Sequence, residues 1–248
     1  MIKHVKVHHR NIPGIVEASD INHEFYVVEE YVNGETLEEK LENGARYLEK
    51  YVIEIVLQVC DALEFLHQFN PPIIHRDVKL SNIMISNDGI VKLIDYNAVR
   101  YYEEGVNKDT MLIGTVGYAA PEQFGFSQTD VRTDIYAVGI VLNHMLTGCH
   151  ISEEICDGKC REIVKKCTQM DPNNRYQTVK ELKEDLQDIL EDKLVKSRTS
   201  KADNVLSLIK RVCFVLQVLF LISLITNYNG IASILPIINQ EQLAVQIV

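Results

Sequence analysis

Apolar residues recur three or four positions apart in three stretches of the chain, and each stretch predicts an amphipathic helix. The first runs from Tyr47 to Phe69, and the proline pair at residues 71–72 ends it. The second runs from about Asp134 to Leu146 and stops before Gly148, and the third covers about Val179 to Leu190. We therefore expect a helical core built from these three segments.

Three further stretches have different patterns. Residues 24–34 are rich in β-branched and aromatic side chains and end in Asn-Gly, which predicts a strand that runs into a turn. Residues 89–94 form a short hydrophobic run that ends at Asp95. Between residues 192 and 204 the chain becomes polar and charged, which indicates a linker after the last predicted helix.

The C-terminal region contains an uncharged, almost wholly apolar segment at residues 212–226, and Asn227 and Tyr228 extend it toward the length of a membrane-spanning helix. Lys and Arg residues precede this segment and none follows it. Because basic residues accumulate on the cytoplasmic side, we expect a basic juxtamembrane linker at 191–211, a single transmembrane helix at 212–228 and a short extracytoplasmic tail at 229–248. The alternative is an amphipathic or buried helix that closes the domain, which the uniform apolarity disfavours.

The formal net charge of the 248 residues is −10 and the basic residues are dispersed, so the composition indicates no nucleic-acid partner. The chain has six cysteines, without a Cys-x-x-Cys pair. Cys156 and Cys160 are the closest two, and they lack a matching second pair or nearby histidines. We therefore expect reduced thiols in a cytosolic domain rather than a metal site.

The densest group of reactive side chains lies at residues 75–82, with the sequence His-Arg-Asp-Val-Lys-Leu-Ser-Asn. At this spacing Asp77 can take a proton from a hydroxyl, Lys79 can steady a phosphate and Asn82 can hold a metal ion. The loop resembles the catalytic loop of eukaryotic-type serine/threonine protein kinases, in the form that bacteria carry.

The motifs that follow resemble those of the same family in order and in spacing. Asp95 stands where the family has its second metal-binding aspartate, and residues 114–122, which end in Ala-Pro-Glu, resemble the end of an activation segment. Residues 134–139 are similar to the start of the central helix of the large lobe. Residues 171–176 resemble the late motif whose arginine pairs with the glutamate of Ala-Pro-Glu.

The resemblance implies an α+β, protein kinase-like fold over residues 1–190, mostly the helical large lobe with only the end of the small lobe, followed by the transmembrane helix. It implies ATP and Mg²⁺ as cofactors. It also implies protein substrates with serine or threonine acceptors, since a lysine at position 79 is typical of that class.

Within this resemblance, Asp77 would orient the attacking hydroxyl and take its proton, and Lys79 would neutralise charge on the transferred phosphoryl group. Asn82 and Asp95 offer oxygen ligands for Mg²⁺ and, together with Lys79, would contact the nucleotide. The backbone from Glu30 to Val32 would form the hinge that contacts adenine.

The resemblance also assigns regulatory and supporting roles. Arg76 would pair with a phosphate on Thr110, for which an unmodified loop threonine is the alternative. Thr115 would hold Asp77 and Lys79. Structural support, as packing, loop anchoring or buried ion pairing, is expected from His75, Thr115, Glu122, Asp134 and Arg175.

Three departures from the family bear on activity. Asp95-Tyr96-Asn97 replaces Asp-Phe-Gly, where Tyr96 can fill the space of Phe if its hydroxyl finds a partner, and Asn97 best tolerates the positive φ that glycine allows. Glu29 stands at the back of the nucleotide pocket, where an apolar side chain is more usual. The chain has no Gly-x-Gly-x-x-Gly loop and no Val-Ala-x-Lys strand, so the resemblance covers about the last three quarters of a kinase domain.

Three functions therefore compete. The intact catalytic and metal-binding residues favour a membrane-anchored serine/threonine kinase with its catalytic part in the cytoplasm. The missing phosphate loop and strand lysine favour a catalytically impaired scaffold or binding protein. A lipid or small-molecule kinase is the least favoured, because the Ala-Pro-Glu segment with Gly114 and Thr115 is that of a protein kinase.

Overall fold

The computed structural model describes residues 8–21, 24–102, 115–125 and 128–192. The chain divides into two units, Met1–Glu191 and Asp192–Val248, and the elements described below belong to the first unit. The predicted transmembrane helix at 212–228 and the tail at 229–248 lie outside the described residues, as does nearly all of the linker at 191–211. Within the described ranges, no helix has the length and apolarity that a membrane crossing requires.

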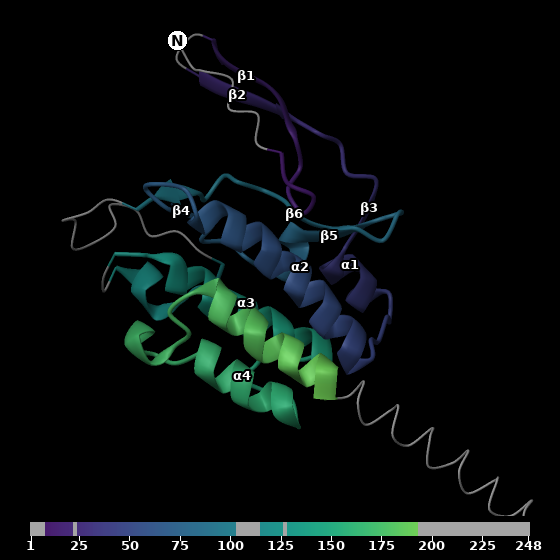
Figure 1. Ribbon diagram of the computed structural model, residues 1–248. Coiled ribbons are helices and arrows are strands. Elements are labelled where there is room, and N and C mark those ends of the chain that lie inside the picture. The colour runs from purple at the N-terminus through teal and green to yellow at the C-terminus, as the bar shows by residue number, and fades with distance from the viewer. Residues whose placement is uncertain (1–7, 22–23, 103–114, 126–127, 193–248) are drawn as a thin grey trace, which may run out of the picture. The chain divides into compact units, whose positions relative to one another are not determined.

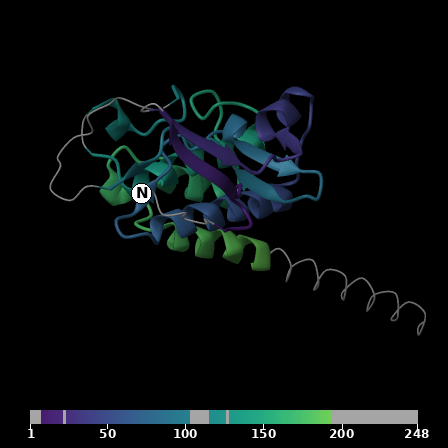
Figure 2. The ribbon, with the colours of Figure 1, turned by 90° about the horizontal axis from the view of Figure 1, so that it is seen from above.

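The N-terminal part is a hairpin in which β1 (Ile15–Ile21) pairs antiparallel with β2 (Glu24–Glu29). Figure 1 shows this ribbon at the top of the molecule, and Figure 2, seen from above, shows it crossing over the elements below. The strand predicted for residues 24–34 is thus found, but it stops at Glu29. The preceding strand was not anticipated, because its sequence, IVEASDI, lacks a clear alternation of apolar and polar residues.

A second sheet has the order β3-β5-β6, with all neighbours antiparallel. Its strands are β3 (Gly34–Thr36), β5 (Ile83–Ser86) and β6 (Val91–Leu93). A Cβ at Gly34 would collide with the backbone of Ile85 and Ser86, so only glycine permits this close pairing. A short pair, β4 (Ile73–Ile74) with β7 (Arg100–Tyr101), forms the third sheet.

All three predicted helices are present. The first is α2 (Glu49–His67), the second is α3 (Val131–Thr147), and the third covers residues 179–192. Two shorter helices, α1 (Leu37–Glu42) and α4 (Lys159–Cys167), were not anticipated because neither is long enough to show a periodic pattern. Single 3₁₀ turns occupy Leu80–Asn82, Pro121–Phe124 and Pro172–Asn174.

The core lies where α2, α3 and α4 pack together. Helix α3 is the most enclosed of them and lies beside α2 in Figure 1. Its N-cap Asp130 accepts a bond from the Arg132 amide, and it ends at Gly148, whose φ of 77° only glycine adopts at low cost. At Gly139 a Cβ would stand 2.5 Å from the Cβ of Cys167, so the small residue sets the approach of α4.

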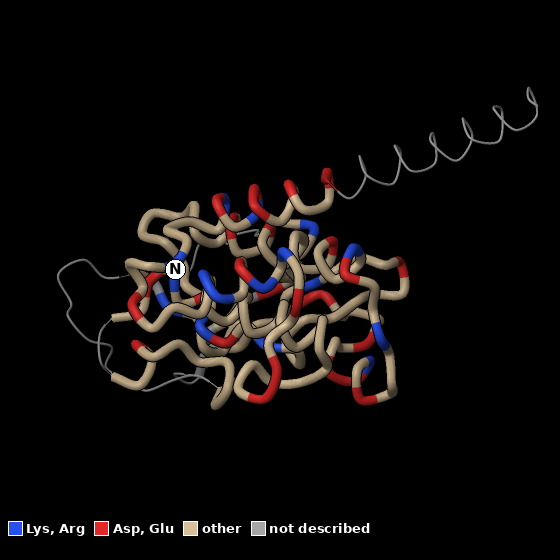
Figure 3. The backbone as a smooth tube through the Cα atoms, turned by 90° about the horizontal axis from the view of Figure 1, so that it is seen from below, with Lys and Arg blue, Asp and Glu red and all other residues tan. Residues whose placement is uncertain are grey.

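Residues of both charges are interspersed along the backbone of the described chain (Figure 3). The five cysteines of the described residues are free thiols, four of them buried. Burial raises the pKa of the Cys60 and Cys167 thiols. These thiols therefore behave as small apolar core residues.

Candidate active site

The backbone of residues 75–77 is held by a side chain from the first turn of α3. Both carboxylate oxygens of Asp134 accept backbone bonds, from the amide of His75 at 2.9 Å and from the amide of Arg76 at 2.8 Å. His67, at the end of α2, lies 2.8 Å from the same carboxylate through its Nε2. Burial raises the pKa of Asp134, but the bonds and charges of His67 and His75 outweigh it and hold that pKa below its ordinary value. The buried anion therefore fixes the backbone that leads into Asp77.

Asp77 is the centre of a network of four side chains. Its Oδ1 accepts a hydrogen bond of 2.7 Å from the Thr115 hydroxyl, and its Oδ2 lies 2.9 Å from the Lys79 ammonium. Lys79 also donates to the Thr115 Oγ1 at 2.9 Å. The Asn82 amide nitrogen donates to the Asp77 carbonyl and to Oδ2, both at 2.9 Å. The structure thus brings Asp77, Lys79 and Asn82 of the predicted catalytic loop together with Thr115, which the resemblance expected to hold the first two.

The Asp77 carboxyl is half-buried, and burial alone would raise its pKa. Donation from Lys79 and Thr115, the charge of Lys79 and the bond from Asn82 together lower the pKa below its ordinary value. Asp77 is therefore an anion at neutral pH, beside a cation. That arrangement can accept a hydrogen bond from a hydroxyl and steady a nearby anionic group.

Asn82 and Asp95 are placed together by the sheet. Ile83 pairs with Leu93 across β5 and β6, and the Ile94 amide donates to the Asn82 carbonyl at 2.8 Å. Because the Asn82 amide nitrogen makes both bonds to Asp77, the side-chain oxygen is left for a cation. Carboxylate and amide oxygens are the ligands that Mg²⁺ prefers, so the residues present fit that ion.

Asp95 has a φ of 64°, and its Oδ1 accepts a bond of 3.2 Å from the Asn97 amide. Among the described non-glycine residues, positive φ occurs only at Asp95 and Arg76. The expectation that Asn97 takes the positive φ of the family's glycine is therefore wrong; the strained backbone is at the aspartate itself, whose short side chain bonds locally.

Tyr96 was expected to replace phenylalanine only if its hydroxyl had a hydrogen-bond partner, and it has one. Its hydroxyl donates to the Leu93 carbonyl at 2.8 Å, and its ring meets the ring of His75 edge to face at 5.2 Å. His75 is fully buried, and burial lowers the pKa of its imidazole. The tyrosine thus takes the place of a phenylalanine without leaving a buried hydroxyl unpaired.

Glu30 and Val32 follow β2, where the hinge was expected. The Glu30 carboxylate accepts bonds from the Gly14 amide at 3.0 Å and from Lys92 at 3.1 Å, and these hold its pKa below its ordinary value. This side chain therefore ties the hinge to the N-terminal segment. Glu29, just before it, has its pKa raised by partial burial and by the negative charge of Asp95.

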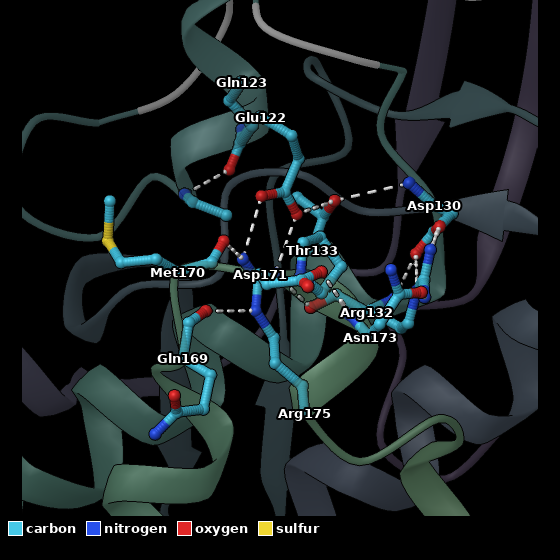
Figure 4. A network of polar contacts seen from close by, with 12 residues as sticks. Glu122, Gln123, Asp130, Arg132, Thr133, Gln169, Met170, Asp171, Asn173 and Arg175 are labelled. Carbon is cyan, nitrogen blue, oxygen red and sulfur yellow. Dashed lines mark hydrogen bonds and ion pairs between the residues drawn. The ribbon is translucent and has the colours of Figure 1, made fainter.

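Glu122 and Arg175 form the buried ion pair that the sequence predicted (Figure 4). Their two bonds are parallel, at 2.8 and 2.9 Å, and both side chains are almost completely buried. Thr133 donates to Glu122 at 2.9 Å, and Arg175 also donates to the carbonyls of Gln169 and Arg132. Each charge is therefore paired and hydrogen-bonded, as a buried ion must be.

Gln123 was missed by the sequence argument. It is buried, its amide nitrogen donates to the Arg76 carbonyl at 2.8 Å, and its oxygen accepts from the Ala120 amide. Its position directly after Ala-Pro-Glu was the available signal. The Arg76 side chain is buried and donates to the Ala98 carbonyl at 2.6 Å, whereas Thr110 lies outside the described residues.

Comparison with known proteins agrees with this geometry. The profile of the protein kinase domain matches residues 1–207. A probable serine/threonine-protein kinase of Clostridium perfringens is 33% identical over 218 residues, which are 78% of this chain and 31% of that protein. Serine/threonine-protein kinase PknB of Mycobacterium tuberculosis is 35% identical over 187 residues, 65% of this chain and 30% of the relative. The chain thus spans about a third of the length of these relatives.

Proposed function

Because this chain belongs to the protein kinase family, we propose that it is a serine/threonine protein kinase, which transfers the γ-phosphate of ATP to serine or threonine hydroxyls of proteins. The observation that carries the proposal is the anionic Asp77, held by Lys79, Thr115 and Asn82. Phosphoryl transfer asks a protein mainly for positioning and for charge stabilisation, and this network supplies both.

Asp77 accepts the hydrogen bond of the attacking hydroxyl and takes its proton late, as the bond from that oxygen to the γ-phosphorus forms and the bond from the γ-phosphorus to ADP breaks. The lowered pKa keeps the carboxylate ready as the acceptor. Lys79 neutralises negative charge on the phosphoryl group, and Thr115 keeps the lysine and the aspartate at their mutual distance of 2.9 Å.

Asn82 and Asp95 would hold Mg²⁺ through their side-chain oxygens. Bound there, the ion would neutralise charge on the phosphates of ATP. The hinge backbone at residues 30–32 would contact adenine.

The test is transfer of labelled γ-phosphate by the protein as its own cell makes it, with Asp77→Asn as the variant. Asparagine keeps the volume and one hydrogen-bond acceptor but cannot take a proton, so we expect a loss of about 10²- to 10⁴-fold. Lys165→Ala, at an exposed position on α4, is the matched control. Undetectable transfer by the unaltered protein, with protein substrates and Mg-ATP present, would contradict the proposal.

A second candidate is a scaffold that binds partners without catalysis. It is motivated by the sequence, which has neither a Gly-x-Gly-x-x-Gly loop nor a Val-Ala-x-Lys strand to cover ATP. Heating the 248-residue chain with and without Mg-ATP separates the two, because a ligand that binds only the folded state raises the melting temperature. An ATP-dependent rise favours the kinase, and its absence favours the scaffold.

Membrane attachment is part of the proposal and is supported by the apolar residues 212–228 and by the basic residues before them. The catalytic part would lie in the cytoplasm, and residues 229–248 outside it. After alkaline extraction, the protein should remain with the membrane pellet, whereas a variant that lacks residues 212–248 should be released. Release of both would show that this segment is not an anchor.

Regulation by Thr110 is likewise a proposal. A phosphate there would carry about two negative charges to the guanidinium of Arg76. Mass spectrometry of the isolated protein should find the phosphate, and Thr110→Ala should lower the transfer rate while Thr110→Glu restores part of it. An unmodified, fully active protein would contradict this role.

A further inference from the structure

The turn at residues 115–119 carries the threonine that contacts Asp77. The amides of Tyr118 and Ala119 donate to the Thr115 carbonyl at 3.0 and 2.9 Å, and Gly117 within the turn has a φ of 95°. The Thr115 hydroxyl stands 2.7 Å from Asp77. The shape of this turn therefore decides where the Thr115 hydroxyl meets the carboxylate.

Packing holds only part of the turn: the Tyr118 ring packs against the core. Val116 is 86% exposed and contributes little packing. The turn also receives polar contacts from the end of α3 and from the loop that follows it. His150 Nε2 lies 2.8 Å from the Gly117 carbonyl, and His144 Nδ1 lies 3.2 Å from the Tyr118 hydroxyl.

The neighbours of His150 determine its tautomer. The Ser152 amide donates to His150 Nδ1 at 3.2 Å, and the Ser152 hydroxyl lies 2.7 Å from the same nitrogen. Since Nδ1 accepts from a backbone amide, the hydrogen is on Nε2, which donates it to the Gly117 carbonyl.

The loop that carries His150 is itself braced. The carbonyl of His150 accepts from the amides of Glu153 and Glu154 at 2.9 and 3.1 Å. The buried Asn143 on α3 donates to the Glu154 carbonyl and accepts from the Cys156 amide, both at 2.8 Å. These hydrogen bonds fix the backbone of the loop, and therefore the position from which the His150 side chain extends.

Gly117 is matched to this contact. A Cβ there would lie 3.3 Å from His150 Nε2, which is a tight approach, and its positive φ disfavours any other residue. Because Gly117 has no Cβ, the His150 imidazole can approach the Gly117 carbonyl closely.

We propose that His150 is a positioning residue: its Nε2–H holds the Gly117 carbonyl and so fixes the turn that places the Thr115 hydroxyl against Asp77 and Lys79. This role rests on the proposed kinase activity for its consequence, although the contact can be tested without it. Residue 150 lies outside the motifs by which the chain resembles the family, whereas residue 117 lies within the motif at residues 114–122.

The test uses the full chain and three variants. His150→Phe keeps a ring but removes the donor, whereas His150→Gln keeps an N–H donor of similar reach. Glu153→Gln, in the same loop, is the control. Without nucleotide, hydrogen exchange of the Tyr118 and Ala119 amides should speed up about tenfold in His150→Phe, as expected for the loss of one hydrogen bond, and stay near the original rate in the other two.

The catalytic readout separates positioning from binding. In the protein that its cell makes, His150→Phe should lower kcat about tenfold with the KM for ATP unchanged, and His150→Gln should recover most of the rate. Unchanged exchange in His150→Phe, or equal acceleration in both His150 variants, would overturn the inference. Hydrogen exchange could follow the prediction while the protein shows no transfer activity. That result would support the contact between His150 and Gly117 and contradict the kinase function.

Discussion

At the scale of single residues, the site depends on buried polar groups whose partners are complete. Asp134 accepts two backbone bonds and a bond from His67, and Arg175 uses its guanidinium on Glu122 and on backbone carbonyls. A buried charge is tolerable only with such a set of partners, because desolvation of an unpaired ion costs several kcal/mol. Removing one partner therefore does more harm than removing both.

Variants of Glu122 and Arg175 can measure the cost of leaving one buried charge without its partner. Arg175→Leu leaves a carboxylate buried without its cation, so the free energy of unfolding should fall by about 3 to 5 kcal/mol in urea titrations. Arg175→Leu combined with Glu122→Met should recover much of the loss. Lys165→Ala, which breaks an exposed pair with Glu162, should change it by less than about 0.5 kcal/mol. A double variant as unstable as the single one would show that the ion pair itself stabilises the fold.

At the scale of elements, α3 organises the molecule. Its first turn holds the segment before Asp77 through Asp134, and its middle packs on α2 and α4. Its last turn contacts Tyr118 through His144, and the loop that follows it contacts Gly117 through His150. The same helix therefore reaches both sides of the candidate active site. The distance between α3 and α4 should therefore affect the candidate active site as well as stability.

Gly139 sets that distance, since a Cβ there would stand 2.5 Å from the Cβ of Cys167. Gly139→Ala should overpack the interface and lower the free energy of unfolding by about 1 to 3 kcal/mol, despite the better helix propensity of alanine. Gly14→Ala is the matched control, because its nearest neighbour, a Glu30 oxygen at 3.7 Å, is at ordinary contact distance. Thermal melts of the two variants give the comparison, and equal melting temperatures would contradict the overpacking.

At the scale of the whole molecule, stability should depend on pH through buried histidine. Burial lowers the pKa of His75 below its ordinary value of 6.5, and the negative charges of Asp134, Asp77 and Asp95 oppose it only in part. The unfolded chain therefore takes up a proton before the folded chain does. Stability is complete above about pH 6.5 and falls as the pH decreases toward the folded-state pKa. Burial also lowers the pKa of His9 and of His144, so they act in the same direction.

His75→Phe should flatten this dependence. The ring keeps its contact with Tyr96 but no longer titrates, so the free energy of unfolding should decrease less between about pH 7 and pH 5. One proton accounts for a slope of at most about 1.4 kcal/mol per pH unit. Tyr96→Phe, which alters the same contact without removing a group that titrates in this range, should keep the original slope. Denaturant titrations at several pH values decide between the two results.

Much of this architecture could be predicted from the sequence, and the failures have physical reasons. The three long helices were visible because an apolar face repeats over several turns. Strand β1 and the short helices α1 and α4 were missed because short or irregular segments give no periodic signal. Asp77, Lys79 and Asn82 were found because one loop carries them all, and Thr115 joined them only through the family resemblance.

The sequence by itself determined the long helices, the chemistry of residues 75–82 and the family, because these are encoded by residues close together in the chain. Only the tertiary structure decided which distant segments meet. Beyond the contacts that the resemblance implied, Gln123 reaches Arg76 across 47 residues, and His150 reaches Gly117 across 33. Such contacts depend on the path of the backbone through the packed core and on the completion of each buried polar group, which no local pattern of residues records.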